Sequence, residues 1–306
     1  MGPELNHPLS NKFDSRSFTW SPCGRLVTAG YRGAAEIWDP LTSEPLSNLQ
    51  PTKPTYRLVC ALAYSPDGRT LAALSTTSFI IWDIKTGGVA KEIECGAEVR
   101  HGDTTEVPLV WSLDGQAIAI RATTPDNLGS AVHVYNIASG AVQSHVPLQP
   151  LAILHLWAHG ESFRIVTTKW DQQTRRGTID VSEVGSVLTK IESFHIGLEV
   201  DGRIDCFSPT AYRIVVLNHG QCQIFDIRNR ERLLEEARHS SSHCFSSDGG
   251  LFAAILGGEG CVQVWKYGSG CYTAWGKFSA QGINASLQFS PDLSSIAAWF
   301  PDFLRV

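Results

Sequence analysis

One short pattern recurs seven times along the chain and limits the possible folds more than any other feature. In its clearest copy, SPDGRTLAALSTTSFIIWDIKTGG (residues 65–88), a turn signal leads into an apolar run, a polar break, a second apolar run and Trp-Asp. We call the first residue of each turn the anchor. The anchors recur every 38 to 50 residues: Ser21, Ser65, Ser112, Ala158, Ser208, Ser246 and Ser290. Repeats of this length are typical of the four-stranded blades of a β-propeller.

Each copy of the pattern predicts a set of antiparallel strands. A first strand ends at the anchor, and Ser-Pro-Asp-Gly then reverses the chain, because Pro presets φ and Gly accepts a positive φ. The run that follows, such as LAALS, is almost continuously apolar, which predicts a strand buried on both faces. A third strand and a poorer outer strand complete the copy. We therefore predict an all-β chain in which residues 1–306 form a single domain, a seven-bladed β-propeller of four-stranded antiparallel blades.

One position of the repeat carries a large aromatic side chain at the end of the third strand, commonly followed by Asp. We predict that these aromatic residues pack inside the fold and do not contact a ligand. The residues of this structural repeat are Trp38, Asp39, Trp82, Asp83, Tyr135, Phe225, Asp226 and Trp265.

The last repeat is incomplete at its C-terminal side. The chain ends at Val306, one residue before the position where Trp is expected. The spacing of the other outer strands places the missing strand within residues 2–9, GPELNHPL. Pairing there would cover the open edge of the last blade, and prolines are tolerated on an outermost strand.

The residues SPDG and IWDIKTG resemble those of the WD-repeat family of β-propellers, and the resemblance covers essentially the whole chain. It implies a seven-bladed disc that serves as a rigid docking platform for other proteins. Two features of that family's repeats are missing here. No Gly-His precedes a first strand, and the clean copies lack the Asp that usually stands in the turn before the Trp strand. Packing is therefore expected to stabilise these blades.

A narrower resemblance is carried by the phrase IIWDIKTGGVAKEIECG, residues 80–96. It is similar to the divergent WD repeats that follow NACHT-type NTPase domains in mushroom-forming fungi. This implies the sensing and autoinhibitory propeller of a signalling receptor, or a stand-alone relative of one. The chain has no phosphate-binding loop of its own, so it would be the propeller half alone.

Composition and charge narrow the class of partner. A formal net charge of −5 provides no basic field, which argues against nucleic acid. The chain has no apolar run of about 18 residues, so we expect no membrane span. The N-terminus has no secretory signal, which makes the cytoplasm the expected location. The eight cysteines include no C-x-x-C pair and are expected to be reduced structural thiols.

The chain contains no motif for catalysis. It has no H-E-x-x-H, no G-x-S-x-G and no Gly-rich dinucleotide turn, and its ten histidines are scattered without ligand spacing. We therefore expect no enzyme activity, no cofactor and no metal site. The alternative is a propeller that binds a small ligand or a glycan, which would need one aromatic-plus-polar set repeated in corresponding loops. A propeller hydrolase comes third, because the positions expected to line the channel read Ala, Val and Thr.

Two insertions between the second and third strands are the candidate binding site. Residues 121–131, RATTPDNLGSA, supply Asp126 and Asn127 on a rigid polar turn. Residues 168–178, TKWDQQTRRGT, form the second insertion. The two lie in adjacent repeats, so we expect them side by side on one partner-binding face.

The second insertion supplies Trp170, Arg175 and Arg176. An aromatic beside two guanidinium groups suits an acidic, partly apolar protein surface, because Arg pairs bidentately with carboxylates. The opposing interpretation is a solvated hairpin tip in which Trp170 folds onto its neighbour. We predict a non-catalytic scaffold that binds other proteins, either as a monomer or as part of a larger complex.

Overall fold

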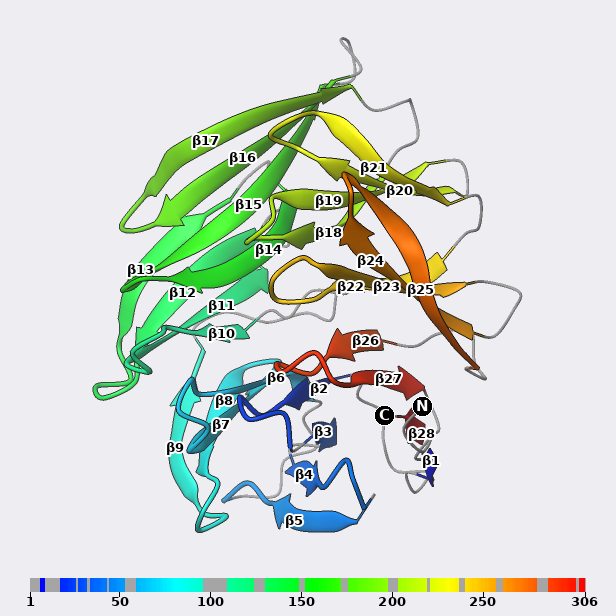
Figure 1. Ribbon diagram of the computed structural model, residues 1–306. Helices are drawn as coiled ribbons and strands as arrows, with labels where there is room; N and C mark the ends of the chain where they lie inside the picture. Colours follow the sequence, from blue (N-terminus) through cyan, green and yellow to red (C-terminus); the bar gives the residue numbers. More distant parts are fainter. Residues whose placement is uncertain are drawn as a thin grey trace.

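Strands are the regular elements of this protein throughout the part of the chain that the structure describes. The computed structural model describes residues 6–8, 17–25, 27–31, 34–42, 44–52, 59–95, 109–123, 130–148, 152–171, 176–197, 203–218, 221–236, 240–256, 261–279, 286–300 and 303–305. Within these ranges no helix is long and apolar enough to cross a membrane. The described strands form seven sheets, each of four antiparallel strands (Figure 1). The predicted all-β architecture of four-stranded antiparallel sheets is confirmed.

We number the sheets I to VII in the order in which their first strands follow along the chain. Sheet I contains β2 (Phe18–Trp20), β3 (Val27–Tyr31), β4 (Ala34–Trp38) and β5 (Pro45–Leu49). Sheet II contains β6 (Val59–Tyr64), β7 (Thr70–Ser75), β8 (Ser78–Asp83) and β9 (Val89–Glu94). Sheet III contains β10 (Leu109–Trp111), β11 (Ala117–Thr123), β12 (Ser130–Asn136) and β13 (Val142–Pro147). Sheet IV contains β14 (Ala152–His159), β15 (Ser162–Asp171), β16 (Arg176–Val184) and β17 (Leu188–Gly197).

The remaining three sheets come from the C-terminal part of the chain and one N-terminal strand. Sheet V contains β18 (Arg203–Ser208), β19 (Arg213–Asn218), β20 (Gln221–Asp226) and β21 (Glu231–Glu236). Sheet VI contains β22 (Ser240–Phe245), β23 (Leu251–Leu256), β24 (Cys261–Gly268) and β25 (Cys271–Ser279). Sheet VII contains β26 (Ser286–Phe289), β27 (Ile296–Phe300), β28 (Phe303–Arg305) and β1 (Asn6–Pro8).

The N-terminal strand β1 is the fourth strand of sheet VII. It pairs antiparallel with β28, with Asn6 opposite Arg305 and Pro8 opposite Phe303. The first and the last described strands of the chain therefore lie side by side in the same sheet (Figure 1). β1 falls within residues 2–9, where the repeat spacing predicts the missing strand. Its proline is accommodated because the strand is at the sheet edge.

The first strands of successive sheets lie beside one another. β6 contacts β2 and β10, β14 contacts β10 and β18, and β22 contacts β18 and β26. Trp20 Nε1 donates a hydrogen bond to the carbonyl oxygen of Gln288 at 3.2 Å, which joins β2 to β26. Trp111 Nε1 makes the equivalent bond to the carbonyl oxygen of Ala63 at 3.0 Å. In both cases the donor is the residue directly before an anchor. The acceptor lies two positions before the anchor of the adjoining sheet, Ser290 in the first case and Ser65 in the second.

The hydrophobic core lies between the faces of neighbouring sheets. Phe79 and Ile81 of sheet II pack with Trp111, Ile118 and Tyr135 of sheet III. Second strands with a fully described burial pattern are buried on both faces: all six residues of β23, LFAAIL, and five of the six residues of β7 are buried. This confirms the prediction from their continuous apolarity, since a sheet covered on both sides does not alternate polar and apolar residues.

A β-bulge interrupts the pairing of the third and fourth strands at the same place in sheets I to VI. On the third strand, the residue at the aromatic position directly follows its neighbour. Their two partners on the outer strand are not adjacent, because one extra residue lies between them. The extra residues are Leu46, Ala90, Gln143, Ile191, Leu233 and Trp275. A bulge leaves its extra residue unpaired and bends the strand. The repeat therefore places one outer-strand residue per sheet in a distinct environment.

Candidate functional site

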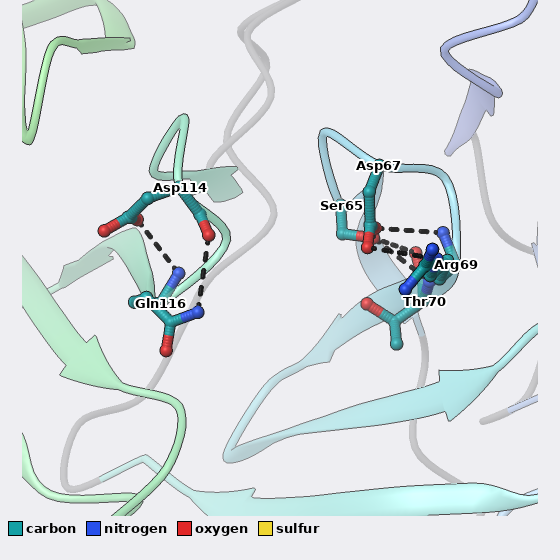
Figure 2. A network of polar contacts seen from close by, with 6 residues as sticks. All are labelled: Ser65, Asp67, Arg69, Thr70, Asp114 and Gln116. Atoms are coloured by element: carbon teal, nitrogen blue, oxygen red, sulfur yellow. Dashed lines mark hydrogen bonds and ion pairs between the residues drawn. The ribbon is translucent and has the colours of Figure 1, made fainter.

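The anchor serines hold the turns between the first and second strands. Ser65 Oγ donates a hydrogen bond to Asp67 Oδ1 at 2.6 Å and accepts one from the backbone N–H of Thr70 at 3.0 Å. Asp67 Oδ1 also accepts from the backbone N–H of Arg69 at 3.1 Å (Figure 2). The Ser65 side chain is buried. These bonds satisfy a hydroxyl group whose burial would otherwise cost free energy.

The same serine-to-aspartate bond recurs in three further turns. At 2.6 Å in each case it joins the pairs Ser112 and Asp114, Ser246 and Asp248, and Ser290 and Asp292. In all four turns this bond is the largest cause that lowers the pKa of the carboxyl group. In sheet I, Cys23 stands where the others have Asp, and its Sγ lies 3.2 Å from Ser21 Oγ. The repeated carboxylates thus bond within their own turns.

The turns of neighbouring sheets touch one another. A Cβ atom placed on Gly24 would lie 3.5 Å from the Asp292 carboxyl group, and one placed on Gly68 would lie 3.5 Å from Pro22. Thr210 Oγ1 donates a hydrogen bond to the carbonyl oxygen of Ser247 at 2.7 Å. We call this end of the sheets the turn end. Because strands alternate in direction, the connections between second and third strands lie at the opposite end, which we call the hairpin end.

The insertion of sheet III lies at the hairpin end. β11 ends at Thr123 and β12 begins at Ser130. Asp126 and Asn127 fall between them and lie outside the described residues. The binding role predicted for these two residues stays a prediction.

The insertion of sheet IV is largely strand and not loop, which corrects the expectation for residues 168–178. β15 continues to Asp171 and β16 begins at Arg176, so that these two residues pair and Trp170 lies opposite Gly177. The insertion lengthens the hairpin because the pairing continues in regular register. Arg175 lies outside the described residues. The backbones of Trp170 and Arg176 are therefore placed at the last pairs of the hairpin.

Polar contacts fasten the outer strand of sheet IV to this hairpin. Lys190 Nζ lies 2.8 Å from Asp180 Oδ2, and Ser193 Oγ donates to Asp180 Oδ1 at 2.6 Å. Thr178 Oγ1 and His195 Nδ1 lie 3.3 Å apart. Strands β15, β16 and β17 have 10, 9 and 10 residues, and Figure 1 shows them as long neighbouring arrows. Sheet IV thus ends in a three-stranded arm supported along its length.

The aromatic residues at the ends of the third strands belong to the core. Trp38, Trp82, Tyr135 and Trp265 are buried, and Phe225 is partly buried against the core. The following acidic side chains close the next turn. Asp39, Asp83 and Asp226 accept hydrogen bonds from the backbone N–H groups of Leu41, Thr86 and Arg228 at 2.8, 2.7 and 2.9 Å.

A buried arginine that the sequence interpretation missed joins sheet V to sheet VI. Arg213 Nη1 donates to the carbonyl oxygen of Gly249 at 2.6 Å and to the hydroxyl of Tyr272 at 3.0 Å. The guanidinium carbon lies 3.6 Å from the ring centroid of Tyr267. Burial raises the pKa of Tyr272 to about 12, so this hydroxyl stays protonated and donates to the Gly249 oxygen at 2.6 Å. In sequence, one Arg before an apolar strand looks like an ordinary surface charge.

Histidine and cysteine side chains do not gather into a metal-binding cluster in the described ranges. No group of three or more His, Cys, Asp and Glu there could hold a metal ion. His133 and His145 face each other across β12 and β13 with ring nitrogens 3.2 Å apart, and burial lowers the pKa of His133. All eight cysteines lie in the described ranges, and none forms a disulfide there.

Among the Trp, Phe and Tyr side chains whose exposure the structure describes, the most exposed lie on β25. Trp275 is 60% exposed and Phe278 is 41% exposed. The sequence interpretation did not single them out, although the strand CYTAWGKFS carries one charge in nine residues. The low charge of this outer strand is the sequence feature from which its exposed aromatic side chains could have been predicted.

No protein-family model matches the chain, and no curated protein matches it in sequence. Solved structures match over almost its whole length. A chain of the mitotic checkpoint complex aligns with a TM-score of 0.68 and 13% identity, over 99% of this chain and 91% of that one. The C-terminal WD40 domain of Sif2 gives 0.67 and 13%, over 99% and 96%. A chain of Kuenenia stuttgartiensis hydrazine synthase gives 0.69 and 14%, over 98% and 97%.

At these identities the likeness shows the fold alone. It supports the β-propeller fold that the sequence predicts, and one of the three structures is a WD40 domain. Another belongs to an enzyme, so the fold does not by itself separate a scaffold from a catalyst.

Proposed function

We propose that residues 1–306 form one closed seven-bladed propeller that acts as a non-catalytic scaffold for binding other proteins. One observation carries this proposal. The polar side chains that recur from sheet to sheet bond to their own turns or strands, as in the four serine-aspartate pairs. These repeated polar groups stabilise the fold, whereas individual loops and outer strands differ in sequence from sheet to sheet. That division suits a rigid platform whose specificity lies in a few variable segments.

We assign the partner-binding face to the hairpin end of sheets III and IV. Their first strands β10 and β14 are in contact, so the two sheets are neighbours. The arm of sheet IV carries Trp170 and Arg176 at the end of its hairpin. The chemistry of Trp170, Arg175 and Arg176 suits an acidic, partly apolar protein surface. Rigid strands on both sides reduce the entropy lost when such a tip binds.

A finer proposal concerns the biological setting. The resemblance of residues 80–96 to fungal NACHT-associated WD repeats would make this scaffold the sensing half of a cytoplasmic receptor. That proposal rests on the sequence phrase alone. Co-purification with a phosphate-loop NTPase from the source cells would support it, and partners of other classes alone would contradict it.

Affinity pull-down with three baits tests the scaffold function. The first bait is the parent chain, and the second carries Trp170→Ala, Arg175→Glu and Arg176→Glu. The third carries Arg69→Glu and Lys85→Glu, which makes the same change in charge on exposed residues at the turn end. We expect the parent and the third bait to retain the same specific partners and the second to lose them. Equal partner sets for all three would move the site, and a parent without any specific partner would overturn the function.

A further inference from the structure

We propose that the outer edge of β25, with which no further described strand pairs, is a docking site for an extended acidic segment of a partner protein, which adds to sheet VI as a fifth strand. This inference rests on the proposed scaffold function and names a second surface of it together with a class of partner. An added strand gains affinity from backbone hydrogen bonds and specificity from alternate side chains.

Strand β25 lacks the features that protect the outer strands of sheets I to V. A strand at a sheet edge exposes backbone N–H and C=O groups, and proteins commonly protect it with Pro or charged residues. β5 and β13 contain Pro45 and Pro147. β9 and β21 carry three and four charged residues in six, and β17 carries Lys190 and Glu192. β25 has nine residues, no proline and a single charge, and it lies at the edge of its sheet.

Trp275 of β25 presents a large aromatic side chain to solvent. As the extra residue of the bulge opposite β24, it lies outside the regular pairing, and it is 60% exposed. Leu233 holds the same position in sheet V but is only 3% exposed and packs in the cluster that contains Tyr272. The structure therefore buries an apolar bulge residue in one sheet and presents one to solvent in the next. A large, amphipathic ring in this position is the type of residue that dominates binding energies.

The other exposed groups of this strand extend the same surface. Phe278 lies over Gly276, with ring atoms 3.5 Å from where a Cβ atom would stand. Lys266 Nζ on β24 lies 6.0 Å from the Trp275 ring centroid. The ring and the ammonium group thus form one aromatic and cationic patch beside the strand edge.

Charge indicates an acidic partner. Residues 261–279 include Lys266 and Lys277 but no Asp or Glu. Within this chain, β25 already contacts β21, whose sequence is ERLLEE. A second copy of sheet VI would bring Lys266 near another Lys266, whereas an acidic strand would complement the charge of Lys266 beside Trp275, and opposite charges across a pair of strands stabilise the pairing. We therefore assign the edge to an acidic segment and not to self-pairing.

The test uses the full chain and a fluorescein-labelled eight-residue peptide of alternating Val and Glu. Its counterparts are a Val-Lys peptide and a Val-Glu peptide with N-methyl groups on alternate amides. We expect fluorescence anisotropy to rise with the Val-Glu peptide only, and less so at high salt. Hydrogen exchange of the complex is expected to slow at amides of residues 271–279.

Two variants locate the site. The double substitution Trp275→Ala, Lys266→Glu is expected to lower the affinity for the Val-Glu peptide by about tenfold or more. Such a loss is typical of an interface hot spot. Leu46→Ala is the matched control, because Leu46 is the 55% exposed bulge residue of sheet I. The control is expected to bind like the parent. Both replacements affect exposed side chains, and circular dichroism melting verifies that each variant folds.

Each remaining outcome overturns the inference. Equal binding by the Trp275→Ala, Lys266→Glu variant, absence of binding by the parent, or protection of a different strand would remove β25 as the site. A dimer of the parent in sedimentation that the variant abolishes would assign the edge to a second copy. The scaffold function is judged separately: if this variant, used as bait, keeps all partners of the parent, the docking edge fails and the scaffold stands.

Discussion

The indole nitrogen of Trp20 donates a hydrogen bond to the carbonyl oxygen of Gln288, 3.2 Å away and 268 positions along the chain. Trp20 ends the first strand of sheet I, and Gln288 lies in the first strand of sheet VII. The bond therefore joins the first repeat to the last. The bond from Trp111 to Ala63 joins sheets III and II in the same way.

Replacing Trp20 by Phe tests whether this bond stabilises the fold. We expect a loss of about 0.5–1.5 kcal/mol in the free energy of unfolding, the usual contribution of one hydrogen bond. Trp111→Phe should cost a similar amount in urea titrations. Trp157→Phe, at the same repeat position in sheet IV, serves as the control for lost ring area. Three equal losses would show that ring area alone matters.

Trp82 should behave as a core residue and Trp275 as a surface residue. Trp82 is fully buried, and its indole donates to the carbonyl oxygen of Gln50 at 2.9 Å. Trp82→Ala is expected to cost about 3–5 kcal/mol through the cavity it leaves. Trp275→Ala should change stability by about 0.5 kcal/mol or less. Chemical denaturation measures the loss in the free energy of unfolding for each variant. Similar losses for Trp82→Ala and Trp275→Ala would contradict the sheet assignment.

Gly249 should be far less replaceable than Gly115, although both have φ near +70°. A Cβ atom on Gly249 would lie 2.4 Å from Ala211 Cβ and 2.8 Å from Ser208 Oγ, whereas no atom of the described residues lies within 4 Å of a Cβ atom placed on Gly115. Gly115→Ala carries only the backbone cost of the left-handed conformation, about 1–2 kcal/mol. The Gly249→Ala substitution must also push sheets V and VI apart. The melting temperature of this variant should therefore fall further than that of the Gly115→Ala variant. Equal melting temperatures would refute the close contact.

The serine-aspartate turns should make stability depend on acidity. The hydroxyl bond keeps the pKa of Asp67 and Asp114 below the ordinary value in the folded chain, and unfolding restores it to about 3.9. Ionised carboxylates thus favour the folded state above about pH 4. That contribution is lost as the pH falls through the folded pKa.

The measurement compares urea midpoints between pH 6 and pH 3. The parent should lose more stability on acidification than the Asp67→Asn, Asp114→Asn variant, because Asn does not titrate. Glu92→Gln, on the outer strand β9, controls for removal of a surface charge. Parallel curves for parent and double variant would show that these turns do not contribute to acid sensitivity.

The repeat anchors were predictable because their causes are local. A turn such as SPDG is set by φ preferences of adjacent residues, and the second strands are recognised by continuous apolarity. The position of β1 followed from the same spacing. The loop expected over 168–178 was wrong at both ends, since a hairpin can lengthen wherever its two strands keep register, and composition does not show where pairing stops.

Other features depend on neighbours that are distant in sequence. Arg213 is an ordinary charge until Gly249 and Tyr272 of the next sheet surround it. The six outer-strand bulges arise from the register between third and fourth strands, which no single residue type marks.

The sequence by itself determined the strand order, the turns and the repeat length, because each depends on residues within one copy of about 40 positions. The tertiary structure alone decided which apolar outer-strand residues are covered. Leu233 and Trp275 hold the same place in successive repeats, yet one is buried and the other exposed. Leu233 is covered because it packs in the cluster that contains Tyr272 of the next sheet, whereas Trp275 stays largely exposed. This difference depends on packing between sheets, and no local sequence pattern encodes it.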